Sequence, residues 1–283
     1  MQAKTQTPGD LFIRPRDMAF SHEGPHPRWW LNGDPIATAF FNALSTSFPE
    51  GERFFMDAVR PYRDVVDPKL REQIMRFTAQ EALHSREHRA FNNSLVAQGY
   101  DLERINSYLK ARFDFGRKLP RFNWLCATIA LEHFTAILAH AILTDPRDLA
   151  GAPSELAQLW RWHAIEEIEH KAVAFDTFLA VTQKLSGLRR WWIRCFSMFF
   201  TTIMFLQFLA FGVREFFRQD GIDTWENRRA MISYLWNTPG LLRRVAPAYF
   251  AYYKPHFHPW QSDDRLLIVG VESTLTRNRA YAV

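Results

Sequence analysis

Side chains recur at helical spacing along residues 156–177, and this stretch restricts the fold more than any other part of the chain. The recurring positions are Leu156, Trp160, His163, Glu167, His170, Ala174 and Thr177. Successive members are three or four residues apart, so they share one face of an α-helix. Turned inward, that face buries a carboxylate between two imidazoles. An unpaired carboxylate in an apolar seam costs several kcal/mol, so Glu167 must be neutralised, paired or bound to a metal.

The Glu-x-x-His pair in this stretch has a second copy earlier in the chain. Asp67 is a suitable N-cap for a helix, and Gly99 is a suitable stop. The apolar face between them carries Glu81 and His84, with His88 one turn later. A Glu-x-x-His pair lets one helix offer a carboxylate oxygen and an imidazole nitrogen to the same ion. One such pair is a weak signal, whereas two on separate buried faces favour a metal site.

Two further predicted helices each carry one inward glutamate. Residues 35–60 place Glu52 in a stripe of aromatic side chains, although Pro49 is expected to kink or interrupt this helix. Residues 121–144 place Glu132 on a face that is otherwise apolar. Arg and Lys are absent from all four inward faces. The alternative to metal binding, in which buried cations neutralise these acids, is therefore disfavoured.

The four glutamates form a twofold internal repeat. Glu52 precedes Glu81 by 29 residues, and Glu132 precedes Glu167 by 35. Ferritin-like di-iron and di-manganese proteins use one Glu from each of two helices and a Glu-x-x-His pair from each of two others. Every one of those positions is filled in this chain. The six candidate ligands are Glu52, Glu81, His84, Glu132, Glu167 and His170.

The pattern predicts an all-α fold, a ferritin-like four-helix bundle with a long crossover and extra C-terminal helices. We assign residues 1–34 to an irregular N-terminal arm and residues 35–187 to the di-metal bundle, with residues 101–119 as the crossover. Residues 188–283 form a hydrophobic and basic helical extension that packs on the bundle or on a membrane. Shorter helices are expected within residues 225–253.

Several phrases of the chain resemble a known family. They are FFNALSTSFPEGERFF, QEALHSREHRAFN, ALEHFTA and WHAIEEIEHKAVAFD. They are similar to bacterial proteins labelled predicted metal-dependent hydrolases, in the ferritin-like superfamily, over roughly residues 35–260. The ligand set itself resembles that of di-iron oxygenases and oxidases. His163, Glu167 and His170 also form a His-x-x-x-Glu-x-x-His motif, which is similar to that of p-aminobenzoate N-oxygenase.

The ligand types indicate the metal and the roles of each residue. Carboxylates and imidazoles without thiolates suit iron first, with manganese or zinc as alternatives. We expect two ions, with Glu52 and Glu132 as terminal ligands and Glu81 and Glu167 as bridges. His84 and His170 would each bind one ion, His163 would be an additional ligand, and His88 would belong to the second shell. Because the second and fourth bundle helices are antiparallel, His88 and His163 should lie toward the same end of the bundle.

The last third of the chain combines positive charge with an apolar run. Residues 188–283 hold 13 Lys and Arg against 7 Asp and Glu. Residues 195–213 contain no charged side chain, and aromatic and basic residues flank them on both sides. This run is near the lower length limit for spanning a bilayer. Its three interpretations are membrane association, a buried core helix and an oligomer interface, here a homodimer.

The start of the chain lacks the apolar segment of a secretion signal, so we expect a cytoplasmic protein, peripheral or monotopic on the inner membrane face. The leading functional hypothesis is a di-iron protein that activates O2 to oxidise an apolar or lipid-like small molecule, with electrons from a separate reductase. The alternatives are a metal-dependent hydrolase with a metal-bridging hydroxide and a non-catalytic metal- or lipid-binding protein. No nucleic-acid-binding motif accompanies the basic charge.

Overall fold

The computed structural model describes residues 6–20 and 26–280 of the chain, and side chains up to residue 275. These residues form helices and contain no strand, which confirms the predicted all-α fold. The helices are α1 (Pro35–Val59), α2 (Pro68–Ala97), α3 (Glu103–Arg117), α4 (Arg121–Thr144), α5 (Ser154–His170), α6 (Val173–Val181), α7 (Gly187–Gln219), α8 (Trp225–Trp236), α9 (Leu241–Ala251) and α10 (Arg265–Ala280). Short 3-10 turns cover Arg60–Tyr62, Pro146–Leu149 and Pro259–Gln261.

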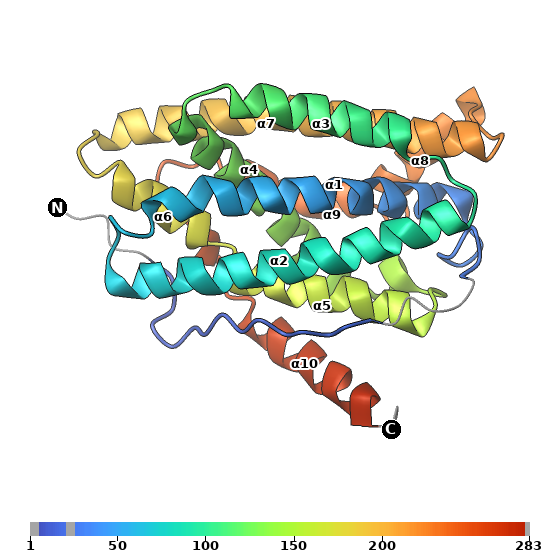
Figure 1. Cartoon of the computed structure of the whole chain (residues 1–283), viewed down its shortest axis with the longest axis horizontal. Helices are drawn as coiled ribbons and strands as arrows, with labels where there is room; N and C mark the ends of the chain where they lie inside the picture. The colour runs from blue at the N-terminus through green and yellow to red at the C-terminus, as the bar shows by residue number, and fades with distance from the viewer. Residues whose placement is uncertain (1–5, 21–25, 281–283) are drawn as a thin grey trace.

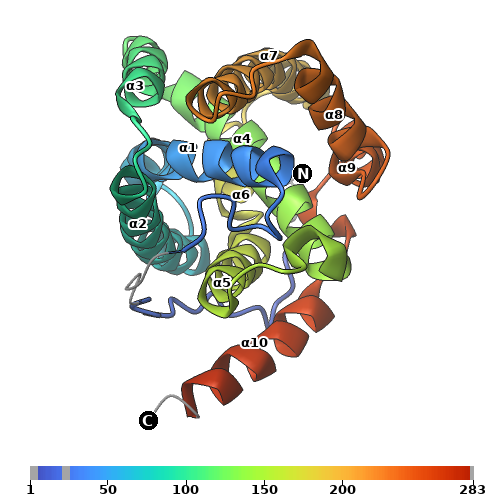
Figure 2. The ribbon, with the colours of Figure 1, turned by 90° about the vertical axis from the view of Figure 1, so that its right-hand side faces the viewer.

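Four of these helices surround one core. Helix α1 packs on α2 and α4, and α5 closes the bundle by packing on α2 and α4 as well. Helix α3 lies outside the bundle and carries the chain from the end of α2 to the start of α4 (Figure 1). Viewed along the bundle, α3 and α7 lie on the same side of α1, whereas α10 projects from the opposite side (Figure 2).

Helices α1 and α2 begin where their N-cap residues allow. The Asp34 carboxylate accepts a hydrogen bond from the Ile36 N–H at 2.8 Å. The Asp67 carboxylate accepts one from the Leu70 N–H at 3.0 Å. Each helix also has proline at its first position, where the missing N–H removes no helical hydrogen bond. These caps fix where α1 and α2 begin.

The expected interruption of the first helix at Pro49 is wrong, because α1 runs through this residue without a break. Proline cannot donate the hydrogen bond that the carbonyl four residues earlier would accept. That carbonyl belongs to Ser45, and the Asn92 side-chain amide of α2 donates to it at 3.1 Å. A neighbouring helix therefore satisfies the carbonyl that Pro49 leaves free, and Glu52 stays in the helical register.

The periodic face of residues 156–177 is divided between two helices, not one. Helix α5 ends at His170, and α6 begins at Val173. Between them lies Lys171, whose buried ammonium donates to Asp264 Oδ2 at 2.5 Å and to the Ser262 carbonyl at 2.8 Å. The spacing of the apolar residues carries no trace of this break, which coincides with an ion pair to a residue 93 positions later.

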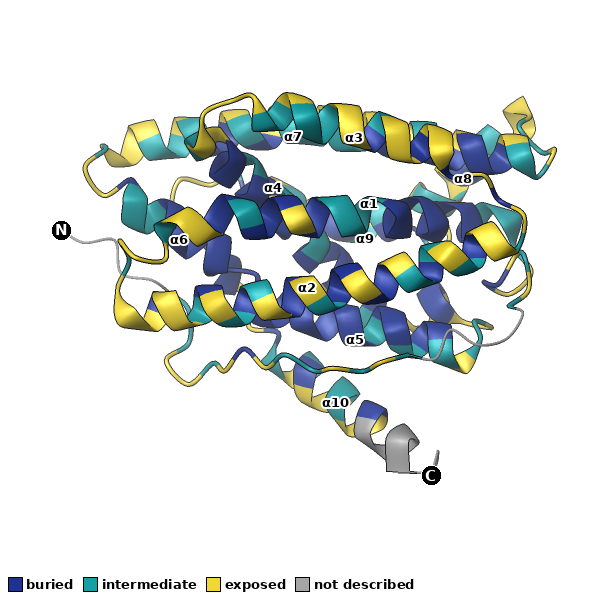
Figure 3. Cartoon of the chain, in the orientation of Figure 1, coloured by how far each residue is buried: buried dark blue, intermediate teal, exposed yellow. Residues whose placement is uncertain are grey.

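Helix α7 packs on α1 and α4, and it also contacts α3. Two helices, α4 and α7, have the length and apolar composition needed to cross a membrane, a test that core helices of soluble proteins also meet. The most apolar part of α4 is 72% buried, whereas that of α7 is only 33% buried. Only about a third of the residues in the run 195–213 are therefore buried, and Figure 3 shows exposed residues on α7.

Candidate metal centre

Every predicted ligand lies inside the bundle. Helix α1 contributes Glu52, α2 contributes Glu81 and His84, α4 contributes Glu132, and α5 contributes His163, Glu167 and His170. All seven residues are at most 4% exposed. The predicted spacing thus brings together residues that are up to 118 positions apart in the sequence. That these side chains bind metal stays a prediction from their arrangement.

One half of the centre surrounds the imidazole of His170. Its Nε2 atom lies 3.2 Å from Glu81 Oε1, 3.5 Å from Glu132 Oε2 and 3.4 Å from Glu167 Oε2. The ligand atoms of Glu81, Glu132 and His170 all lie within 4.8 Å of one another. Such a group of one imidazole and several carboxylates can hold one cation.

The other half surrounds His84 and His163, whose rings stack with their centroids 4.1 Å apart. His163 Nε2 lies 2.8 Å from Glu167 Oε1 and 3.9 Å from Glu52 Oε1. His84 Nδ1 lies 3.6 Å from the same Glu167 oxygen. Glu167 thus has one oxygen in each half, and Glu81 groups with ligands of both halves. Bridging by Glu81 and Glu167 stays a prediction that rests on these positions.

The polar atoms of the centre lack partners of their own. Both oxygens of Glu52, Glu81 and Glu132 are buried without a hydrogen bond, as are Glu167 Oε2, His84 Nδ1 and His170 Nε2. A buried, unpaired polar atom costs roughly 1–3 kcal/mol, and more when it is charged. Two divalent cations would balance the charge of four carboxylates and occupy these lone pairs. The residues present therefore fit two metal ions.

The protonation of the centre responds to burial. Burial raises the pKa of Glu52 well above its usual range, and it does the same for Glu81 and Glu132. Burial acts in that direction on Glu167 too, but His170 and His163 outweigh it and hold the pKa of this carboxyl well below its usual range. Burial also lowers the pKa of His84, which keeps its imidazole neutral. A neutral imidazole is the form that binds metal.

The outer nitrogens of His84 and His170 have acceptors that set their tautomers. His84 Nε2–H donates to Glu166 Oε2 at 3.0 Å, which leaves Nδ1 with a lone pair for the centre. His170 Nδ1–H donates to Gln80 Oε1 at 2.9 Å, which leaves Nε2 free in the same way. Partners of this kind orient ligand imidazoles and raise their basicity.

The N-terminal arm holds these outer partners in place. The Arg16 guanidinium, with its side chain 11% exposed, contacts Glu166 Oε1 at 3.3 Å and Glu169 Oε1 at 2.6 Å. Glu169 in turn accepts from the Gln80 side-chain amide at 2.7 Å. Burial raises the pKa of Glu166 to about 8, against the opposing effect of Arg16. One arginine thus supports the outer partners of His84 and of His170.

His163 has its own supporting chain of hydrogen bonds. Asn92 donates from its amide nitrogen to the Ser45 carbonyl, so its oxygen accepts from Ser45 Oγ at 2.8 Å. Ser45 Oγ then accepts from His88 Nδ1–H at 2.9 Å, and His88 Nε2 accepts from His163 Nδ1–H at 2.6 Å. The predicted meeting of His88 and His163 at one end of the bundle is confirmed, and His88 supports His163 from outside the centre.

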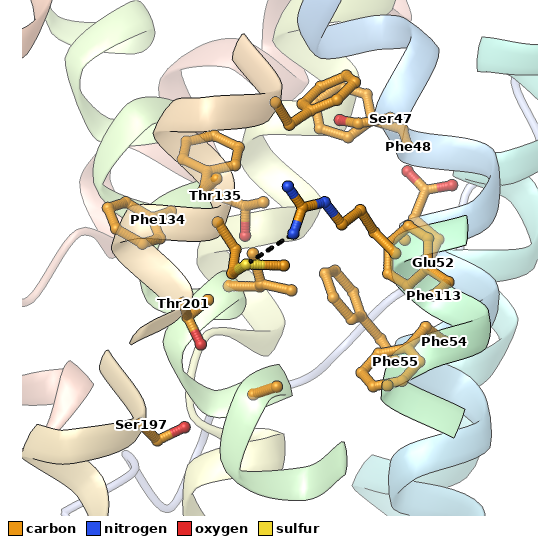
Figure 4. A pocket seen from close by; sticks show the side chains of 18 of the residues that line it. Ser47, Phe48, Glu52, Phe54, Phe55, Phe113, Phe134, Thr135, Ser197 and Thr201 are labelled. Carbon is orange, nitrogen blue, oxygen red and sulfur yellow. Dashed lines mark hydrogen bonds between the residues drawn. The ribbon is translucent and has the colours of Figure 1, made fainter. Parts of the chain in front are cut away.

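A cavity of about 840 Å³ reaches the centre from the side of α3 and α7. Its lining includes Glu52, His163 and Glu167, whereas Glu81, His84, Glu132 and His170 do not line it. The remaining wall is mainly apolar and comes from α1, α3, α4, α5 and α7. Figure 4 shows Glu52 among the side chains that line this wall, with Phe48, Phe55 and Phe113 also labelled. A substrate in the cavity would meet the half of the centre that contains Glu52 and His163.

The model of one protein family, described as "predicted metal-dependent hydrolase", matches residues 14–263 of the chain. The chain belongs to this family. The match covers the arm residue Arg16, the whole bundle and helices α7 to α9. No curated protein and no solved structure matches the chain. Membership of the ferritin-like superfamily and similarity to p-aminobenzoate N-oxygenase therefore have no support beyond the motifs themselves.

The sequence patterns did not identify Glu166, Glu169 and Arg16, which support the candidate ligands. Glu166 and Glu169 flank Glu167 in the run EEIEH, but their spacing places them off the inward face, where a solvent-facing role is expected. Arg16 lies in a segment without periodicity, so no pattern connects it to the centre. The clue available in the sequence was the excess of acids next to a ligand glutamate.

Proposed function

We propose that this chain is a two-metal enzyme that hydrolyses a bond in a substrate with a long apolar chain. The proposal rests chiefly on one observation: nine buried ligand atoms without hydrogen bonds face one another beside a mainly apolar cavity. The family description favours hydrolysis as the reaction. When bound, two metal ions polarise a substrate carbonyl or phosphoryl oxygen and lower the pKa of a coordinated water.

In this proposal the cavity wall binds the substrate, and Glu52 transfers a proton. The mainly apolar wall of the cavity takes up the substrate chain and excludes bulk water, which strengthens electrostatic interactions at the centre. Glu52 lines both the cavity and the centre, and neither of its oxygens has a hydrogen bond. As a terminal ligand that also faces the cavity, Glu52 would hold an ion beside the substrate, and its uncoordinated oxygen would accept the proton released when water attacks.

A second candidate is O2-dependent oxidation of the same class of substrate. The observation that favours it is the scarcity of proton donors in the cavity, because hydrolysis also needs an acid for the leaving group. Within the part of the chain that the structure describes, the ionisable lining residues are Glu52, Arg112, Cys126, His163 and Glu167. Four carboxylates and three imidazoles also suit iron. In this case a separate reductase would supply the electrons.

Two parallel assays separate the candidates. The full chain is loaded with Fe(II), Mn(II) or Zn(II) and offered p-nitrophenyl esters with acyl chains of two to twelve carbons. Hydrolysis that rises with chain length and disappears in Glu81→Gln would support the leading proposal. O2 uptake by the Fe(II) form with dodecanol and a chemical reductant, without ester turnover, would support the second. A chain that binds none of the metals would overturn both.

We further propose that the exposed face of α7 contacts a lipid surface. Phe196, Phe199 and Phe200 are 49–65% exposed on this helix, and Trp192 precedes them at 60%. The helix begins with the basic pair Arg189 and Arg190. Contiguous exposed apolar groups mark interaction surfaces, and basic residues beside them favour an anionic membrane. A second copy of the chain is the competing occupant of this face.

A further inference from the structure

Arg112 on α3 differs from every other residue of the cavity wall. It is the only Lys or Arg among the lining residues that the structure describes. The other ionisable side chains of the wall are the ligands Glu52, His163 and Glu167, and Cys126, whose pKa burial raises to about 12. The cavity thus has acidic ligands and one separate cation, with apolar side chains making up most of the remaining wall.

The described residues place no carboxylate within ion-pair distance of Arg112, in contrast to its neighbours on α3. Arg104 pairs with Glu215 at 2.8 Å, Lys110 pairs with Asp114 at 2.6 Å, and Arg117 also contacts Asp114. Surface cations on helices usually find such partners among nearby acids. A charge that faces an apolar cavity without a counter-ion is poised for an anionic ligand.

Neutral groups hold the Arg112 guanidinium in place. Its Nη2 atom donates to Tyr108 Oη at 2.8 Å and to Gln207 Oε1 at 3.1 Å, and its Nη1 atom contacts Met204 Sδ at 3.3 Å (Figure 4, dashed line). These contacts fix the side chain between α3 and α7. They use three of the five N–H donors of a guanidinium, so two donors remain for a ligand.

The cavity opens to solvent along α3 and α7. Phe115 of α3, Leu119 just after this helix, and Trp192, Phe196 and Phe200 of α7 line the cavity and are at least 40% exposed. Arg112 itself is partly exposed. An anionic group bound there would keep contact with water, while its apolar chain enters the wall toward Glu52. Binding would thus avoid the cost of burying an unpaired charge.

We propose that Arg112 binds the carboxylate of a single-chain fatty-acid-like molecule whose apolar chain fills the cavity. The two remaining donors, Nε–H and one Nη1–H, belong to a cation, which favours a carboxylate over a hydroxyl or an amine. The inference rests on the proposed function only in naming its substrate class. It places the carboxylate at the rim, away from the metal ligands, so the reacting bond lies along the chain or at its far end.

Fluorescence titration tests this binding without turnover, because Trp160 and Trp192 line the cavity. The full chain is titrated with dodecanoate, dodecanol and dodecyl phosphate. The variants are Arg112→Gln, Arg112→Lys and the control Arg104→Gln, which also loses a bond between α3 and α7 but lies outside the cavity wall. We expect Arg112→Gln to weaken dodecanoate about tenfold or more, with dodecanol changed less than about twofold. Arg112→Lys should retain part of the affinity, and Arg104→Gln all of it.

Four results would overturn the proposal. Equal loss of dodecanoate and dodecanol in Arg112→Gln would mean that Arg112 only packs α3 against α7. No binding of either ligand by the wild-type chain would mean that the cavity does not take up such molecules. Dodecyl phosphate that binds more than tenfold tighter would identify a phosphate site, and loss in Arg104→Gln would indicate a general effect of helix packing. The binding titration does not require turnover. Its results would therefore still test the role of Arg112 if the proposed hydrolysis were not observed.

Discussion

His88 Nε2 lies 2.6 Å from His163 Nδ1, and this contact sets the state of the site-facing nitrogen of His163. Because the Ser45 hydroxyl donates to Asn92, its oxygen accepts from His88 Nδ1–H. His88 Nε2 is then an acceptor, so His163 carries its proton on Nδ1. Its Nε2 lone pair then faces Glu167 Oε1 at 2.8 Å. Two acceptors this close need either a proton or a metal ion between them. The arrangement therefore supports His163 as a metal ligand.

Replacing His88 tests this support. In His88→Leu the Nδ1 proton of His163 loses its acceptor, and the ring loses its fixed orientation. We expect the ion on the His163 side to bind about 10- to 100-fold more weakly, while the second ion is retained. Competition with a chelator measures both affinities. The control is Ser94→Ala on the same helix, because the Ser94 hydroxyl donates to the Phe91 carbonyl of its own helix.

Removing a bridging carboxylate should have a larger effect. Glu81→Gln takes one negative charge from the centre and leaves two cations without a shared ligand, so their mutual repulsion rises. We expect fewer than one ion per chain by elemental analysis, against two in the wild type. Glu72→Gln is the matched control on α2, since Glu72 is exposed and pairs with Arg76 of the same helix. Two tightly held ions in Glu81→Gln would contradict the bridging role.

The buried ion pairs of Arg16 predict a stability difference within the arm. Arg16→Gln leaves Glu166 and Glu169 buried without their cation, and removing one partner of such a pair typically costs about 3 kcal/mol. Arg14→Gln is the control, because its guanidinium is 64% exposed and pairs with the partly exposed Glu272. We expect a loss below about 0.5 kcal/mol there. Urea unfolding of both variants gives the comparison, and similar losses would contradict the assigned role of Arg16.

His133 predicts a pH dependence of stability. Burial lowers the pKa of this imidazole from 6.5 to about 4, although its hydrogen bond with the Ala248 carbonyl at 3.1 Å acts the other way. The unfolded chain therefore binds more protons between these values, and the contribution of His133 is lost as pH falls from about 6.5 to 4. In His133→Gln the free energy of unfolding should depend less on pH in this window. Identical pH profiles would show that His133 does not titrate as expected.

The exposed face of α7 predicts attachment to anionic vesicles. Double replacement of Phe196 and Phe200 by Ser should reduce sedimentation with anionic vesicles, because both rings are exposed. High salt should weaken binding of the wild-type chain without abolishing it, since salt screens the arginines but not the apolar contact. Ile36→Val, in the bundle away from this face, serves as a control. If the chain binds neither anionic nor neutral vesicles and sediments as a stable dimer, the exposed face of α7 is the interface between two copies of the chain.

The spacing of residues along the chain was sufficient to identify the candidate centre. Glu52, Glu132 and the two Glu-x-x-His pairs lie on inward faces because helical periodicity is a local property. The caps Asp34 and Asp67 are equally local, since their side chains bond to N–H groups two or three residues away. For the same reason the all-α fold could be predicted without any knowledge of how the helices pack.

Contacts between distant segments decided the rest. The Asn92 amide of α2 satisfies the carbonyl that Pro49 leaves free, so α1 continues past this proline. Asp264 forms an ion pair with Lys171 at the break between α5 and α6. Arg16 reaches its partners across about 150 residues, and the cavity exists only where α3 and α7 pass over the bundle. Each of these features depends on which surfaces meet after folding. The free energy of such contacts comes from burial and pairing in three dimensions, which the order of residues along one helix does not encode.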